Sequence, residues 1–193
     1  MNEITGLVAH DAGGAEVLAS WAVHCCKQTL ISYTEGPARG IFTRAGINQA
    51  ANLDELIRKS TKIITATSWQ STLEKETIKK CQGQNKYVCT ILDHWVNYEE
   101  RFHLNNEVVM PNQVWTLDRH AHQIAKYTFE GTEIIQIKNV YLEKRIQKVK
   151  EFQVHDKSRQ ALFLGENIKE HALRSYGDEN YFGYNEESLL GKL

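Results

Sequence analysis

A series of short apolar runs, separated by segments with the apolar spacing of helices, constrains the fold of this chain more than any other feature. The runs extend from Ile4 to His10, Leu30 to Thr34, Lys62 to Ser68, Lys86 to Leu92, Val114 to Leu117 and Ile134 to Ile137. Continuous apolar strands are typical of a sheet that helices cover on both faces. The repeated order of strand and helix therefore predicts an α/β protein with a doubly wound, mostly parallel sheet.

The segments between these runs predict the covering helices. They are Ala15 to Gln28, a segment that contains Leu53, Leu56 and Ile57, Gln70 to Lys80, Arg119 to Tyr127, and the charged stretch from Leu142 to Phe152. Thr67 and Ser68 are placed to cap the helix that begins at Gln70, because hydroxyl side chains accept hydrogen bonds from the first helical N–H groups. The pair Ile41 and Phe42 is interpreted as a short extended piece.

The length of 193 residues suits one full α/β domain and the start of another. We assign residues 1–153 to the first domain. In the remainder, 154–193, a polar linker over 154–160 precedes an apolar run over 161–166, a helix over 168–176 and a tail over 185–193. Two interpretations stay open: this segment begins a second domain that the chain mostly lacks, or its strand joins the edge of the first sheet.

Composition indicates an ordinary soluble globular protein, with 41% hydrophobic residues, 24% charged residues and a net charge of -1. Nothing in this balance indicates a nucleic-acid partner. The four cysteines have neither zinc-site nor redox-motif spacing, and the chain shows no signal segment or long apolar run. We therefore expect a reduced, cytoplasmic protein that does not span a membrane.

Two groups of histidine or basic residues are not interpreted as binding sites. His120 and His122 follow Asp118, but residues two apart on a helix do not share a face, so no metal site is predicted. The basic residues near the end of the first domain are interpreted as a solvated face, with peripheral contact to an anionic membrane as the alternative. These residues are Lys144, Arg145, Lys148 and Lys150.

Polar side chains follow several of the predicted strands, where ligand sites form in open α/β sheets. They are His10 and Asp11, then Thr67, Ser68, Trp69 and Gln70, then Asp93, His94 and Trp95, and finally Asp118. A histidine oriented by a carboxylate is a suitable general base near neutral pH. We predict His10 as that base and Asp93 or Asp118 as its carboxylate. The alternative is that His10 only binds the loop and Asp11 caps the first helix.

Two further features bear on a ligand. Gly13 and Gly14 either allow an anion to approach backbone N–H groups or serve a tight turn; neither a dinucleotide fingerprint nor a Walker sequence is present, so no bound cofactor is predicted. Asn97 and Arg101 lie among aromatic residues on a predicted loop of about 15 residues. Such a cluster suits a carbohydrate or nucleoside, or fastens the loop to the domain.

Three motifs carry a resemblance to a known family. The segments His10–Glu16, Thr67–Gln70 and Leu92–Phe102 resemble the amino-terminal half of bacterial glycosyltransferase-like surface-polysaccharide biosynthesis proteins, which have two Rossmann-like domains in the GT-B arrangement. The segments 165–172, 176–178 and 182–184 are similar to the opening of the second domain in that family. The resemblance covers most of the chain, and Asp93–Phe102 is its most specific part.

The resemblance implies an acceptor-side domain for cell-surface polysaccharide synthesis, with a nucleotide-sugar donor as a substrate held mainly by a second α/β domain or partner chain. It implies His10 as base, with Asp93 or Asp118. Substrate binding is assigned to Asp11, Gly13, Gly14, Thr67, Ser68, Trp69, Gln70, His94, Trp95, Asn97, Arg101 and Glu166. Transfer by this chain alone is not expected, because most of the donor half is missing.

Two other functions are carried as alternatives: a non-catalytic sugar- or nucleotide-binding protein that acts through a partner, and a small hydrolase or transferase that uses the same histidine and aspartate. A homodimer is a further possibility, because a domain without its partner leaves apolar surface uncovered.

Overall fold

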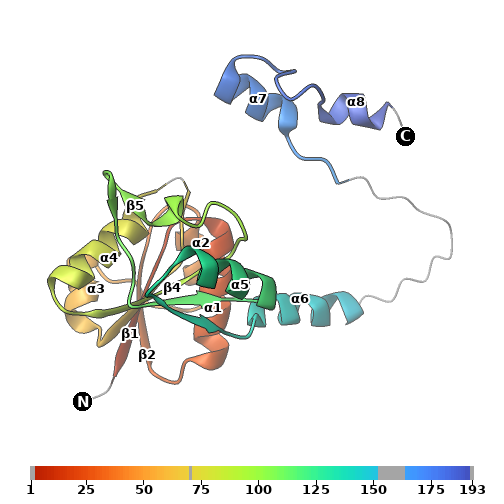
Figure 1. Cartoon of the computed structure of the whole chain (residues 1–193). Helices are drawn as coiled ribbons and strands as arrows, with labels where there is room; N and C mark the ends of the chain where they lie inside the picture. Colours follow the sequence, from red (N-terminus) through yellow and green to blue (C-terminus); the bar gives the residue numbers. More distant parts are fainter. Residues whose placement is uncertain (1–2, 70, 152–163, 192–193) are drawn as a thin grey trace. The chain divides into compact units, whose positions relative to one another are not determined.

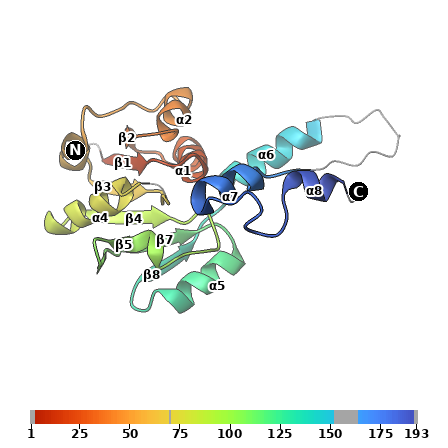
Figure 2. The same ribbon diagram turned by 90° about the horizontal axis from the view of Figure 1, so that it is seen from above.

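The computed structural model describes residues 3–69, 71–151 and 164–191, which fall into two units, 1–152 and 153–193. A parallel six-stranded sheet forms the centre of the first unit (Figures 1 and 2). Its strands are β1 (Ile4–Ala9), β2 (Thr29–Thr34), β3 (Lys62–Thr65), β4 (Tyr87–Ile91), β7 (Gln113–Thr116) and β8 (Glu133–Gln136). The prediction of a doubly wound parallel sheet is confirmed.

The strand order is β2-β1-β3-β4-β7-β8, and Figure 2 shows the strands in this sequence down the page. β1 pairs with β2 on one side and with β3 on the other, so the chain reverses its winding direction between β2 and β3. The loops after β1 and β3 therefore leave toward opposite faces of the sheet. This reversal is the point at which doubly wound sheets open a crevice for ligands.

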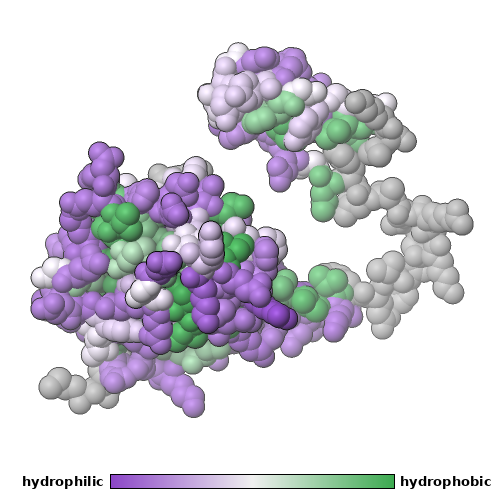
Figure 3. Space-filling view, viewed as in Figure 1, coloured by the Kyte–Doolittle hydropathy of each residue, from purple (hydrophilic) through white to green (hydrophobic). Residues whose placement is uncertain are grey.

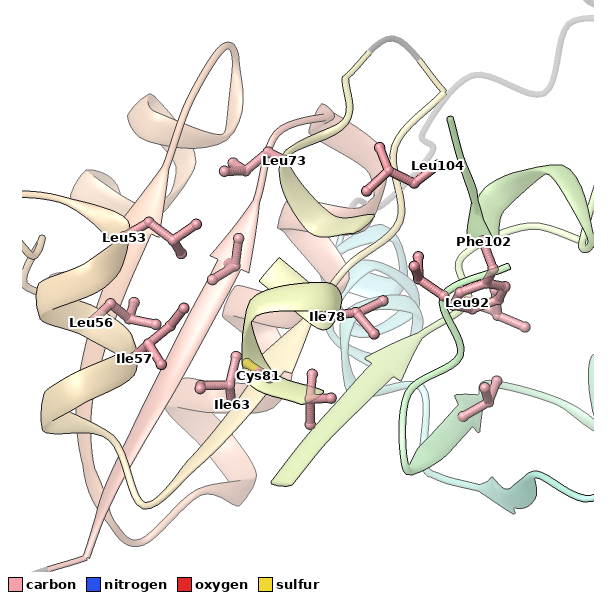
Figure 4. Packing of buried hydrophobic residues seen from close by; sticks show 14 of the residues in the cluster. Leu53, Leu56, Ile57, Ile63, Leu73, Ile78, Cys81, Leu92, Phe102 and Leu104 are labelled. Carbon is pink, nitrogen blue, oxygen red and sulfur yellow. The ribbon is translucent and has the colours of Figure 1, made fainter. Parts of the chain in front are cut away.

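Helices cover both faces of the sheet. On one face lie α1 (Ala12–Cys25), α2 (Ala38–Arg44) and α6 (Val140–Glu151), and on the other lie α3 (Leu53–Lys59), α4 (Leu73–Gly83) and α5 (Arg119–Thr128). Alternate residues of β1 serve the two cores, since Leu7 packs with the α1 face and Val8 with the α3 and α4 face. Figure 4 shows the second of these cores, with α3 and α4 packed against the strands.

The structure corrects three local predictions. Ile41 and Phe42 are helical, because Pro37 precedes α2 and their buried side chains face the core together with Ala38, at helical spacing. The first helix begins at Ala12 and ends at Cys25, earlier at both ends than predicted. α4 begins only at Leu73, so neither Thr67 nor Ser68 caps it.

The long loop after β4 is folded onto the domain. It contains a 3-10 turn, η1 (Glu100–Phe102), and a small hairpin of β5 (His103–Leu104) and β6 (Glu107–Val108). Phe102 and Leu104 are buried in the core that Figure 4 shows, and the Tyr98 ring stacks on Phe129 at 5.9 Å between centroids. These aromatic residues fasten the loop, whereas the tryptophan that begins it stays exposed.

The second unit holds α7 (Ile168–Tyr176), as predicted, and α8 (Glu186–Leu190). The predicted strand over 161–166 and the linker before it lie mostly outside the described residues; residues 164–166 have no regular secondary structure. Within the described ranges 3–69, 71–151 and 164–191, no helix combines the length and apolar character needed to cross a membrane.

Candidate functional site

His10 and Asp11 follow β1 directly and form a hydrogen-bonded pair. His10 Nδ1 lies 2.7 Å from Asp11 Oδ1, and the two side chains keep 21% and 27% of their exposure. Asp11 Oδ2 accepts a second bond, 2.9 Å long, from the backbone N–H of Trp69, just after β3. Burial opposes ionisation of Asp11, but its hydrogen bonds with His10, Trp69 and Ser68 outweigh burial and lower its pKa.

The histidine partner is therefore Asp11, and neither Asp93 nor Asp118 takes the orienting position that the sequence analysis gave them. Asp11 sits at the N-cap of α1, but its side chain makes no capping hydrogen bond. A carboxylate only accepts, so the neutral His10 ring carries its proton on Nδ1 and its lone pair on Nε2.

Gly36, in the loop after β2, lies against the His10 ring. A Cβ at this glycine would stand 2.7 Å from Nε2, and the backbone φ of +51° is itself unfavourable for other residues. The backbone also ties this loop to β1, because Ala38 N–H donates to the His10 carbonyl at 3.1 Å. The position of Gly36 beside the ring depends on the pairing of β1 with β2.

Glu74 is a site residue that the sequence analysis missed. It lies in the first turn of α4, is 3% exposed, and its Oε1 accepts a 2.8 Å bond from the backbone N–H of His10. Its Oε2 has no hydrogen-bond partner within the described part of the chain. Burial, reinforced by the nearby charge of Asp11, raises the pKa of Glu74 to about 7. In sequence it resembles any acidic residue of a first helical turn.

Asp93 belongs to a second, buried cluster after β4. Its Oδ1 accepts a bond from the Thr67 hydroxyl at 3.2 Å and from Arg101 Nη1 at 3.5 Å, and both charged side chains are 7% exposed. Arg101 also donates to Thr67 Oγ1 at 2.7 Å and to the Val96 carbonyl at 3.2 Å. Thr67, Asp93 and Arg101 therefore connect the loop after β4 to the end of β3. These contacts within the protein explain why Arg101 is buried, without a bound ligand.

The two glycines of α1 serve close packing. A Cβ on Gly13 would lie 2.8 Å from Asp93 Oδ2, and one on Gly14 would lie 2.7 Å from the Cβ of Ala66. Both glycines lie within the first helical turn and neither has a positive φ. They allow the start of α1 to approach the ends of β3 and β4. The glycines therefore do not form a tight turn, and their presence is explained by close packing without a bound anion.

Exposed aromatic and imidazole groups surround these buried clusters. Trp69 is 61% exposed and Trp95 is 58% exposed, and Trp95 Nε1 donates to Asp118 Oδ2 at 2.9 Å. Asp118 also caps α5 through Ala121 N–H; burial opposes its ionisation, but these two bonds lower its pKa. His94 extends outward, with Nε2 3.8 Å from Asp93 Oδ2.

The remaining predicted residues divide as follows. Ser68 accepts a bond from Ser71 N–H, and Asn97 adopts a left-handed backbone in the turn that carries Arg101. Gln70 lies outside the described residues. Glu166 belongs to the second unit, where it lines a small hollow of about 290 Å³ with His171 and Phe182.

The described side chains contain no group of three or more histidine, cysteine or acidic residues placed to hold a metal ion. The site can instead accept a proton on His10 while Asp11 balances the resulting charge, beside exposed aromatic faces. Comparison of the chain with protein-family models, curated proteins and solved structures finds no match.

Proposed function

We propose that this chain is the acceptor-side domain of a GT-B-like glycosyltransferase of cell-surface polysaccharide synthesis in the bacterial cytoplasm. The observation that carries the proposal is the His10–Asp11 pair at the end of β1, where the sheet reverses its winding. A general base at this position suits the activation of an acceptor hydroxyl group.

In the proposed reaction, the acceptor oxygen attacks the anomeric carbon of a nucleotide-sugar while its proton passes to His10 Nε2. The new glycosidic bond forms as the bond from the anomeric carbon to the nucleoside diphosphate breaks, and the diphosphate leaves with the electron pair. Asp11 stabilises the imidazolium, because its ionised carboxylate is hydrogen-bonded to the other ring nitrogen. The donor sugar would be held mainly by a second α/β domain or a partner chain.

The two exposed tryptophans favour a carbohydrate acceptor. Their indole faces are large, rigid and amphipathic, and the backbone of Trp69 is fixed next to Asp11. The same feature supports a second candidate, a sugar-binding domain without catalysis, because stacking on an aromatic face needs no base.

Sugar transfer, measured with this chain in the presence of its donor-binding domain or partner chain, separates these candidates. With UDP-, GDP- and dTDP-linked hexoses as donors, we expect His10→Ala to lower kcat by about 10²–10⁴-fold while donor affinity is retained. The matched control is His103→Ala, which removes an exposed imidazole on β5 and should leave transfer unchanged. Transfer that is unchanged in His10→Ala would contradict the assignment of the base.

Binding of soluble mono- and disaccharides to this chain is measured separately by ¹H–¹⁵N NMR. Shift changes at residues 10–14, 67–69 and 93–97, abolished by Trp69→Ala with Trp95→Ala, are expected for both candidates. Binding that persists without either tryptophan would place the acceptor elsewhere on the domain.

A further inference from the structure

Helix α6 carries an exposed apolar stripe. Leu142, Ile146 and Val149 are 50%, 44% and 67% exposed, and their spacing of four and three residues places them on one side of the helix. Figure 3 shows green, apolar side chains on the surface of α6. Three exposed aliphatic side chains in one row are unusual for a helix that faces only water.

The stripe lies on the side of α6 that points away from the domain. Val140, which is buried, and Tyr141, which joins the α1 core, fix the inner side. At about 100° per residue, the stripe is roughly half a turn from Val140 around the helix axis. The domain itself therefore does not cover this stripe.

Two cations of α6 flank the stripe: at 100° per residue, Arg145 and Lys150 lie about 40–100° from its members around the helix axis, whereas Lys144 and Lys148 lie on the side that faces α1 and α2. α6 carries Lys144, Arg145, Lys148 and Lys150 against two glutamates, and one of these, Glu143, is bound by Lys138 at 2.8 Å. Arg145 lies over the Tyr141 ring at 5.0 Å and approaches Glu16 only to 4.0 Å. Among the described residues, the three lysines have no carboxylate within ion-pair distance, so their positive charge is available to a partner.

A groove of about 500 Å³ lies between α1, α2 and α6, on the basic side of the helix. Lys144, Arg145 and Lys148 line it from α6, and Arg44 lines it from α2. Apolar atoms of Val23 and Ile41 line the same groove. Glu16 also lines this groove and approaches Arg44 to 3.7 Å, so the groove balances part of its own charge and is not needed for the surface described next.

We propose that α6 docks this domain on an anionic lipid bilayer, with the apolar stripe in the interface and the cations among the headgroups. A short basic helix with an apolar face is suited to lie in the plane of such an interface. A second copy of the chain is a poorer occupant, because symmetric pairing would bring the cations of both helices together. This surface is separate from the His10 site, so the inference does not depend on the proposed function.

Vesicle sedimentation with the full chain tests the inference. We expect binding to phosphatidylcholine vesicles that contain about one-third phosphatidylglycerol, with little binding to phosphatidylcholine alone and with binding that weakens as salt is added. Ile146→Asp with Val149→Asp should abolish binding. Arg145→Gln with Lys150→Gln should reduce the partition coefficient by about 25-fold, since each cation near an anionic surface contributes about 5-fold.

The matched control is Val108→Asp, which places the same charge at an exposed valine on the β5–β6 hairpin and should leave vesicle binding unchanged. Circular dichroism establishes that each variant keeps its helix content. Failure of the unaltered chain to bind the anionic vesicles at low salt would overturn the inference. So would a dimer in analytical ultracentrifugation that Ile146→Asp dissociates, because the stripe would then be an interface between copies.

Discussion

Asp11 and Asp93 follow two strands of the same sheet, yet their surroundings differ. Asp11 is hydrogen-bonded to the His10 imidazole, and it keeps 27% of its exposure. Asp93 holds a guanidinium, which stays charged, and it is 7% exposed. The difference suits the two aspartates to different roles: Asp11, beside a partly exposed histidine, is placed to serve the proposed reactive site, and Asp93, with a permanently charged and buried partner, holds the loop after β4 against the end of β3.

The largest expected effect is on stability, at Asp93. Asp93→Ala leaves the buried Arg101 cation without its carboxylate, and we expect a loss of about 3–5 kcal/mol in the free energy of unfolding, measured by urea titration. Asp93→Ala with Arg101→Met should recover part of this loss, because no unpaired charge then remains.

The control for this change is Asp54→Ala, which removes a 73% exposed carboxylate that pairs with Lys80 at 2.8 Å. An exposed pair contributes about 0–1 kcal/mol. Equal losses at Asp54 and Asp93 would remove the distinction between the supporting pair and an ordinary surface pair.

Glu74 should give the next largest effect, and the effect should depend on pH. Its pKa of about 7 in the folded protein exceeds the ordinary 4.5, so its contribution to stability is fully present below about pH 4.5 and is lost as pH rises through about 7. Glu74→Gln removes this dependence. Between pH 4.5 and 8, the stability of the variant relative to the unaltered protein should increase by about 3 kcal/mol.

Guanidinium unfolding at several pH values measures this difference. Other titrating groups cancel to first order, because both proteins share them. Asp11 acts in another window: its lowered pKa means that its contribution is lost as pH falls below 3.8. A Glu74→Gln difference that is the same at pH 4.5 and 8 would show that burial does not perturb this carboxyl.

A smaller loss, of about 1–3 kcal/mol, is expected from Gly14→Ala, whose new Cβ would meet the Cβ of Ala66 at 2.7 Å. Gly83→Ala is the matched change, because it adds the same methyl group to α4 where no atom lies within 4 Å. Alanine favours helix there, so a gain of up to about 1 kcal/mol is expected. Thermal unfolding measures both, and a stabilising Gly14→Ala would refute the close approach of α1 to β3.

The smallest effect on stability should come from His10→Ala. The change removes one hydrogen bond from a partly exposed aspartate, which contributes about 1 kcal/mol or less. A loss as large as that of Asp93→Ala, measured in the same urea titration, would assign His10 to the framework of the domain rather than to the proposed reactive site.

The sheet was predictable because burial on both faces makes each strand apolar throughout, as in Ile63 and Ile64, which serve opposite cores. The partner of His10 was not predictable, because the order of the strands cannot be read from the sequence. β3 lies between β1 and β4, and neighbouring strands are about 4.8 Å apart, so His10 and Asp93 follow strands that are not neighbours. Glu74 was not predicted as a site residue, because its burial depends on the packing of α4 against β1, and no local sequence pattern indicates that packing.

The bonds that assemble the site join distant parts of the chain. His10 meets Glu74 across 64 positions, and Asp11 meets Trp69 across 58. Closing loops of this size costs entropy that only the finished sheet repays, so no early or local intermediate can hold these residues in place. The fixed arrangement of His10 and Asp11 is therefore a late event in folding, and the proposed base reaches its position only after β1, β3 and α4 have come together.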